Sequence, residues 1–204
     1  DETISTAVKE IFEEIGAESI QCFDSGIAAW EWLDANEEPD VIIHEWRIPK
    51  LTGPMLIQKI RNKGFYNVPL IVLSSLIKAD DMPLAREMGV SNIISKPLNK
   101  PDFLSNLIWT IQQERLPSET LSVERKIRSA INAKDQKTVD ELLPEFLGSE
   151  NTPIAKKRTI EAEVAFMKKD YKVAQKAGVE AIKMNGDSII LLNLLGKTFM
   201  NLND

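Results

Sequence analysis

The first half of the chain alternates two patterns of apolar residues. In some stretches they recur every three or four positions, which is typical of amphipathic helices; elsewhere they form short runs, which are typical of buried strands. We expect helices at 3–15, 25–36, 53–62, 80–88 and 101–113, and strands at 19–23, 41–43, 68–73 and 92–95. Strands separated by crossover helices form parallel sheets, so the pattern predicts a doubly wound α/β fold.

The second half of the chain has helical periodicity throughout. We expect helices at 123–133, 137–147, 154–168, 171–184 and 188–202, joined by short turns as antiparallel hairpins. Charge also separates the halves, because residues 1–119 carry a net charge of −8 and residues 120–204 carry +2. We therefore predict an α/β domain at 1–116, a linker at 117–121 and an all-α domain at 122–204.

Three polar residues follow the carboxyl ends of predicted strands. They are Glu45, Ser74 and Lys96. Ligands of parallel α/β folds bind at this edge of the sheet, so we expect the three side chains to converge there. Three neighbours are expected at the rim of the site: Trp46, Arg47 and Ser75. Of these, Arg47 and Ser75 are placed to control access to Glu45.

His44 is the only histidine of the chain, which excludes a metal site built on two histidines. Side chains alternate between the two faces of a strand, so His44 points away from Glu45. We expect His44 to be packed and not catalytic.

The spacing of these polar residues resembles that of the receiver domain of bacterial two-component response regulators. The matching positions, within about residues 1–115, are Glu45, Pro49, Gly53, Ser74 and Lys96-Pro97. The resemblance implies a flavodoxin-like fold with a phosphate acceptor at position 45. It also implies that Lys96 neutralises the phosphoryl oxygens and that Ser74 binds them through its hydroxyl. The family's acceptor is an aspartate, so Glu45 departs from the pattern by one methylene group.

The longer side chain of Glu45 leaves three alternatives open. Its carboxylate is displaced by about 1.5 Å relative to that of an aspartate, and phosphoryl transfer tolerates little displacement. Glu45 either imitates the phosphorylated state permanently, pairs with Lys96 in an inactive site, or accepts a phosphoryl group slowly. The first two predict a protein that is no enzyme and signals by protein–protein interaction. The third predicts a phosphorylation-competent receiver, with Mg²⁺-dependent phosphoryl transfer from a histidine kinase.

The resemblance also implies a Mg²⁺ site, whose candidate ligands here are Glu45, Arg47 and Asp1. The acidic pair that completes the site in the family belongs to a first strand. The resemblance places that strand before residue 1, so the first strand is missing from this sequence. We therefore expect Mg²⁺ binding to be weak or absent.

Residues 154–202 resemble a tetratricopeptide repeat (TPR). Small and aromatic residues occupy the packing positions of the repeat: Ala162, Ala165, Tyr171, Ala174, Ala181, Gly196 and Phe199. Ala162 and Gly196 are 34 residues apart, as are Ala165 and Phe199, and this is the period of the repeat. The resemblance implies a groove for a peptide or helix and an array that continues beyond residue 204. A generic helical bundle is the alternative.

Composition narrows the classes of function. The net charge of −6 argues against DNA binding, and the lack of an apolar run of about 18 residues argues against a membrane span. With no secretory leader and Cys22 as the only cysteine, we expect a bacterial cytoplasmic protein, with Cys22 packed in the strand at 19–23. The expected partner is a histidine kinase or another signalling protein, and a scaffold that forms a homodimer through its receiver is a further alternative.

Overall fold

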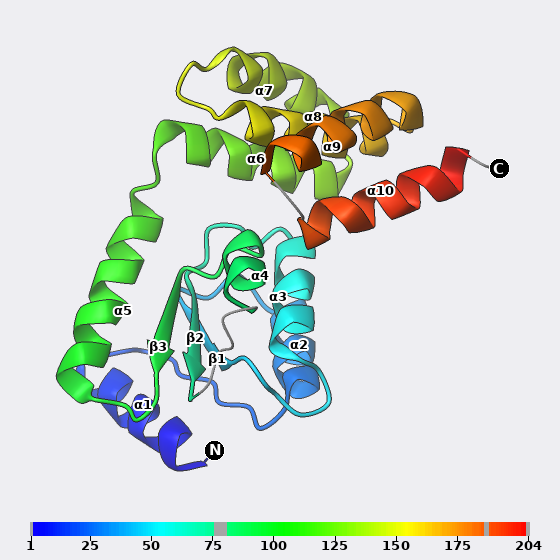
Figure 1. Ribbon diagram of the computed structural model, residues 1–204. Coiled ribbons are helices and arrows are strands. Elements are labelled where there is room, and N and C mark those ends of the chain that lie inside the picture. The colour runs from blue at the N-terminus through cyan, green and yellow to red at the C-terminus, as the bar shows by residue number, and fades with distance from the viewer. Residues whose placement is uncertain (1, 76–80, 186–187, 203–204) are drawn as a thin grey trace. The chain divides into compact units, whose positions relative to one another are not determined.

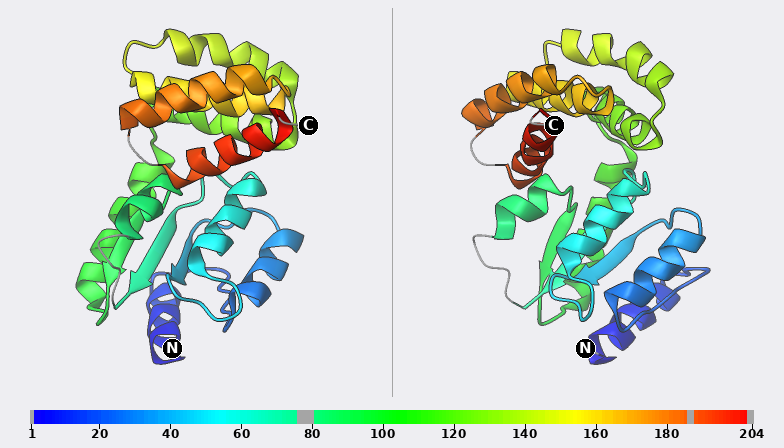
Figure 2. Two further views of the ribbon diagram at one scale, coloured as in Figure 1. Left: turned by 45° about the vertical axis from the view of Figure 1, so that its right-hand side comes forward. Right: turned by 90° about the vertical axis from the view of Figure 1, so that its right-hand side faces the viewer.

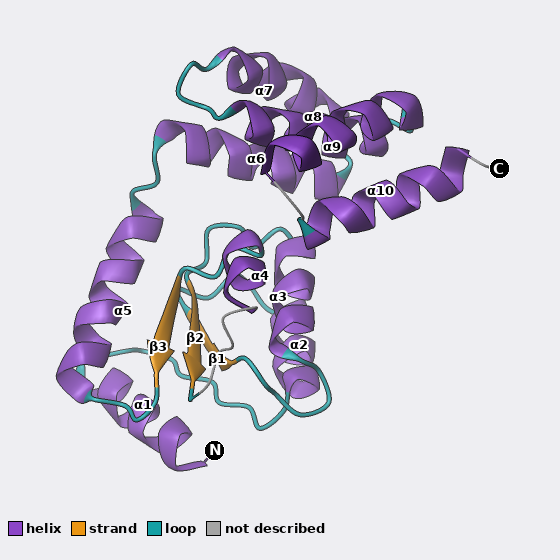
Figure 3. Cartoon of the chain, viewed as in Figure 1, coloured by secondary structure: helices purple, strands orange, loops and turns teal. Residues whose placement is uncertain are grey.

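The computed structural model describes residues 2–75, 81–185 and 188–202. The chain forms two compact units, one of residues 1–61 with 68–115 and the other of residues 62–67 with 116–204. Figure 3 shows that the described strands belong to the first unit, whereas the second is built from helices. None of the described helices combines the length and the apolar character that crossing a membrane requires.

The first unit is an α/β fold with a parallel sheet, as the pattern of apolar residues predicts. Its strands pair in the order β1-β2-β3, with Ile43 beside Ile71 and Leu73 beside Ile94. The elements, shown in Figure 1, are α1 (Glu2–Glu14), α2 (Gly26–Ala35), β1 (Ile42–Glu45), α3 (Gly53–Asn62), β2 (Leu70–Ser74), α4 (Asp81–Glu87), β3 (Asn92–Ser95) and α5 (Lys100–Arg115).

The strand expected at 19–23 is wrong. Residues 19–23 form no strand, and most of their side chains are exposed. Cys22 is likewise exposed and not packed. A strand requires a neighbour for its backbone N–H and C=O groups, and in the described sheet no strand pairs with this segment. Its β-prone residues alone do not produce a strand.

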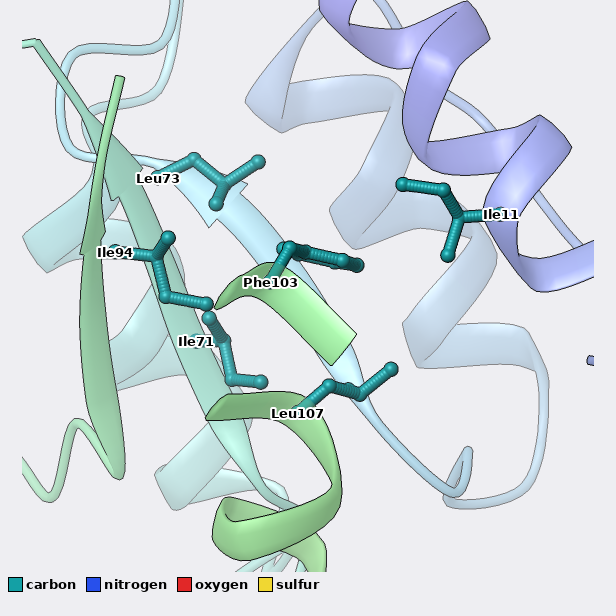
Figure 4. Close-up of a cluster of buried hydrophobic side chains, with 6 residues drawn as sticks. All are labelled: Ile11, Ile71, Leu73, Ile94, Phe103 and Leu107. Atoms are coloured by element: carbon teal, nitrogen blue, oxygen red, sulfur yellow. The ribbon is translucent and has the colours of Figure 1, made fainter. Parts of the chain in front are cut away.

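Strand β2 forms the centre of the first unit because it is buried on both faces. Ile71 and Leu73 point toward α1 and α5, where they meet Phe103 in the cluster of Figure 4. Leu70 and Val72 alternate with them and are also fully buried. Figure 1 shows α2 and α3 on the side of the sheet opposite α1 and α5. Helices therefore cover both faces of the sheet and leave its carboxyl edge for a site.

The second unit consists of five described helices at the predicted places. They are α6 (Glu119–Ala133), α7 (Gln136–Gly148), α8 (Ile154–Met167), α9 (Tyr171–Asn185) and α10 (Ile189–Leu202). Ser118 caps α6 by accepting a hydrogen bond from the backbone N–H of Leu121 at 3.3 Å. Helix α6 thus begins within the segment 117–121 that the sequence pattern predicts as a linker.

Two apolar clusters hold the helices of the second unit together. The first joins α6, α7 and α8 through residues that include Ile127, Val139, Phe146 and Ile160. The second joins α8, α9 and α10 through Ala162, Ala177, Ala181 and Leu191. Short alanine side chains allow the helices of the second cluster to approach closely.

The positions predicted for repeat packing divide into two groups. Five lie at the contact of α8 and α9: Ala162, Ala165, Ala174 and Ala181 are buried, and the Tyr171 ring meets that of Phe166 at 5.6 Å. Gly196 and Phe199 of α10 are exposed, and their packing in a continuing array stays a prediction. Helix α10 buries its other side, through Leu191, Leu195 and Thr198.

A network of ion pairs links α6 to α8. The guanidinium of Arg128 lies 3.3 Å from Glu124 Oε1 and 3.1 Å from Glu163 Oε1, and Lys156 Nζ lies 2.7 Å from Glu124 Oε2. Burial raises the pKa of Glu163, as does the charge of Glu124, whereas Arg128 opposes the rise. The two carboxylates therefore share one half-buried guanidinium.

Candidate functional site

The candidate site lies at the carboxyl ends of the three strands. Glu45 is the last residue of β1, Ser74 is the last residue of β2, and Lys96 follows β3 directly. Because the strands are parallel and in register, these ends meet at one edge of the sheet. The backbone N–H of Lys96 donates to the carbonyl of Ser74 at 3.0 Å, so the end of β3 is tied to that of β2.

Glu45 and Lys96 are in direct contact. Lys96 Nζ donates a hydrogen bond to Glu45 Oε1 at 2.8 Å. The side chain of Lys96 is only 10% exposed, whereas that of Glu45 is 36% exposed. A buried ammonium requires a charged or polar partner, and here the carboxylate at the acceptor position supplies it.

The rim of the site differs in part from the prediction. Arg47 and Ser75 are exposed, and their place at the rim stays a prediction, whereas Trp46 is buried, with 5% exposure. Trp46 is a core residue because the loop after β1 folds back, and the N–H of Gly53 donates to the carbonyl of Trp46 at 3.1 Å. Ser74 is buried at the end of the central strand.

Two glycines allow the loop after β1 to pack closely. A Cβ atom on Gly53 would lie 2.7 Å from the carbonyl oxygen of Trp46, and one on Gly26 would lie 2.4 Å from that of Leu51. The N–H of Gly26 also donates to the carbonyl of Pro49 at 3.3 Å. The start of α2 therefore supports the loop that follows Glu45. Reasoning from sequence missed Gly26, although a glycine beside a cap such as Ser25 is a recognisable signal.

His44 is buried, as expected of a packed histidine. Its Nδ1 lies 3.0 Å from the carbonyl oxygen of Glu45. Burial lowers the pKa of His44, and the contact with the Glu45 carbonyl partly opposes this shift. The imidazole is therefore neutral near pH 7 and does not add positive charge to the site.

The described residues do not fit a Mg²⁺ ion at this site. Mg²⁺ requires several oxygen ligands in near-octahedral geometry, and no three His, Cys, Asp or Glu side chains cluster for a metal within the described ranges. Of the predicted ligands, Glu45 accepts a hydrogen bond from Lys96, Arg47 is an exposed cation, and Asp1 lies outside the described residues.

Known proteins resemble the first half of the chain. Residues 1–108 match the response regulator receiver domain. Chemotaxis protein CheY1 of Helicobacter pylori is 31% identical over 96 residues, which are 47% of this chain and 77% of that protein. The Regulator of RpoS of Escherichia coli K12 is 29% identical over 98 residues, 48% of this chain and 28% of that protein.

Solved structures agree on the fold. A response regulator receiver domain protein from Clostridium thermocellum has a TM-score of 0.50 at 23% identity, covering 56% of this chain and 90% of that one. The signal receiver domain of a putative Luxo repressor protein from Vibrio parahaemolyticus has a TM-score of 0.51 at 14% identity, covering 56% and 86%. Both likenesses concern the fold alone.

Proposed function

The chain belongs to the family of response regulator receiver domains, and we propose that it signals by protein–protein interaction without being phosphorylated. The family implies a role in two-component signalling. The finer proposal concerns the acceptor position, where Glu45 stands in place of the family's aspartate.

The contact between Glu45 and Lys96 is the observation that supports the proposal. Lys96 is the residue that the family resemblance assigns to the phosphoryl oxygens, and its ammonium already lies 2.8 Å from a carboxylate oxygen. A carboxylate oxygen carries negative charge, as a phosphoryl oxygen does, and so satisfies the same cation. A second anion at this lysine would have to displace Glu45 or share the lysine with it. In this proposal the receiver keeps the contact between Glu45 and Lys96 without a phosphoryl group.

The proposal extends to partners and location. The receiver would contact a histidine kinase or another signalling protein in the cytoplasm, without catalysing a reaction. The helical unit, in the TPR-like interpretation, would bind a peptide or helix of a partner. The small residues buried between α8 and α9 support this interpretation, because close helix packing of this kind is typical of helical repeats.

The intact mass of the protein tests the proposal. The protein at its natural length is incubated with acetyl phosphate and Mg²⁺, in parallel with a Glu45→Asp variant and a Glu45→Asp/Lys96→Ala variant. We expect the unchanged protein to gain no phosphoryl group, because its carboxylate is misplaced and engaged by Lys96. Labelling of Glu45→Asp that is lost in the double variant would assign the label to this site. A phosphoryl gain by the unchanged protein would overturn the proposal in favour of a working phosphoacceptor, for which the partial exposure of Glu45 leaves access.

A further inference from the structure

Helix α9 carries a row of lysines on the side that faces away from its neighbours. Lys172, Lys176 and Lys183, here named the lysine row, are exposed, and their spacing of four and seven residues places them on one face of the helix. Helix α9 lies beside α8 and α10 in both views of Figure 2. It packs through buried alanines such as Ala174 and Ala181, each of which is offset by two residues from a lysine and so lies about 200° around the helix.

The lysine row is not neutralised by its own unit. Glu180 is the one acid of α9, and its carboxylate lies 3.0 Å from the guanidinium of Arg158. Within the described ranges, no ion pair involves a lysine of the row. The row extends about 16 Å along the helix axis, so one partner surface meets several ammonium groups at once.

The first unit carries the opposite charge. From residue 10 to residue 46, the sequence has eleven Asp and Glu residues and no Lys or Arg. Four of these acids are exposed at and just after the end of α2, and they are here named the acidic end: Glu31, Asp34, Glu37 and Glu38. In the part of the chain that the structure describes, Glu31, Glu37 and Glu38 take part in no ion pair. Every copy of the chain therefore carries one basic surface and one acidic surface.

We propose that the lysine row of one copy binds the acidic end of a second copy. Charge complementarity supports this occupant, because residues 120–204 carry a net charge of +2 and residues 1–119 carry −8, and opposite charges across an interface attract and orient the partners. A contact between two unlike surfaces leaves one of each free, so it can be repeated from copy to copy. The contact involves neither Glu45 nor Lys96 and goes beyond the proposed function.

The association should be weak and sensitive to salt. An exposed ion pair contributes little by itself, and salt screens it. Sedimentation velocity of the full chain measures the association, at about 0.02 M and about 0.5 M salt. We expect the sedimentation coefficient to rise with protein concentration at the lower salt. At the higher salt, the association should weaken at least about tenfold.

Charge reversal identifies the two surfaces. Lys172→Glu/Lys176→Glu makes the lysine row acidic, and Glu31→Lys/Glu38→Lys makes the acidic end basic. Each double variant alone should associate at least about tenfold more weakly than the unchanged protein, because like charges then meet. A mixture of the two variants should associate again, because the reversed row of one meets the reversed acidic end of the other.

Lys126→Glu/Lys134→Glu is the matched control. It changes the net charge as much as the reversal of the lysine row does, through two other exposed lysines of the second unit. Its association should weaken by less than about threefold. Circular dichroism checks that the variants fold, which we expect because all the replaced side chains are exposed.

Three results would each overturn the proposal. The first is a protein that stays monomeric at the lower salt, since the lysine row would then be solvated or bound to something other than a second copy. The second is an association that persists at the higher salt, or that the control loses as readily as the reversed row does. The third is no association in the mixture of the two reversed variants. Phosphoryl labelling at position 45 is read by mass and not by association, so either proposal can fail without the other.

Discussion

Lys96 reaches Glu45 across the central strand of the sheet. Glu45 ends β1 and Lys96 follows β3, and β2 lies between them, yet Lys96 Nζ is 2.8 Å from Glu45 Oε1. The contact therefore joins the carboxyl ends of two strands that do not pair with each other. The carboxylate of Glu45, at the acceptor position, is therefore paired with the ammonium of Lys96.

The stability of the first unit should depend only weakly on this pair. We expect Glu45→Gln to lower the free energy of unfolding by no more than about 1 kcal/mol, because a carboxylate more than one-third exposed is well screened. Urea denaturation measures the difference. Asp40→Asn, which breaks the highly exposed pair with Arg115, is the control and should cause no measurable change. A loss of more than about 3 kcal/mol would indicate a buried, essential ion pair instead.

The titration of His44 can be followed without assignment, because the chain has one histidine. Its pKa in the folded protein should lie below 6.5, since burial disfavours the charged imidazole. The unfolded chain then binds the proton more readily, so His44 lowers stability as the pH falls below 6.5. The NMR shift of the ring proton gives the midpoint, and His44→Leu should remove this part of the pH dependence. A midpoint above 6.5 would contradict the prediction.

Gly53 should not tolerate a side chain. In Gly53→Ala the new Cβ would meet the carbonyl oxygens of Trp46 and Glu45, at 2.7 and 2.9 Å. Backbone must move to relieve this contact, so we expect a loss of about 1–3 kcal/mol in the free energy of unfolding. Gly196→Ala, in an open part of α10, should instead gain up to about 1 kcal/mol from helix propensity. Chemical denaturation measures both variants. Equal effects of Gly53→Ala and Gly196→Ala would contradict the conclusion that the loop leaves no room for a side chain at Gly53.

Phe103 is the main anchor of α5. It is fully buried beneath the sheet, and its ring meets that of Phe12 edge-on at 6.4 Å. Phe103→Ala should cost about 3–5 kcal/mol of unfolding free energy, from lost burial and the cavity left behind. Trp109 of the same helix is 54% exposed, so Trp109→Ala should stay within about 0.5 kcal/mol. Guanidinium denaturation measures the unfolding free energy of both variants. Similar losses in the two would contradict the role of Phe103 as the anchor of α5.

Glu163 should make the second unit less stable as the pH rises. Its pKa is raised in the folded protein, chiefly by burial, so the folded state holds this proton more tightly than the unfolded chain does. The stabilising contribution is fully present below the ordinary pKa of 4.5 and is lost as the pH rises through the folded pKa. The unfolding temperature should fall less steeply between pH 4 and pH 7 in Glu163→Gln than in the unchanged protein. Glu161→Gln is the control. An unchanged slope would exclude Glu163 as the source.

Local patterns predicted most elements, because their signals lie within each element. The bounds of α3 and β3 agree with prediction to the residue, since Gly53 begins one and a short apolar run forms the other. The segment 19–23 could not be judged in this way, because a strand depends on a neighbour elsewhere in the chain.

The candidate site was predictable to a similar extent. The convergence of Glu45 and Lys96 follows from parallel strands, and their contact was one of the alternatives that the sequence left open. The burial of Trp46 could not be predicted, because it depends on a loop that packs against Gly26, which is distant in sequence.

The ion pairs between α6 and α8 have a consequence for how these helices align. Sliding α8 by one turn would move Glu163 about 5.4 Å along the axis, away from Arg128. An apolar contact between helices tolerates such a slip better, because one aliphatic side chain replaces another. The largely buried carboxylate of Glu163 tolerates the slip poorly, because it would lose the guanidinium of Arg128. A charge that is buried without a partner is strongly unfavourable. The ion pairs of Arg128 with Glu124 and Glu163 therefore favour one alignment of α6 and α8. Hydrophobic packing alone would permit several alignments.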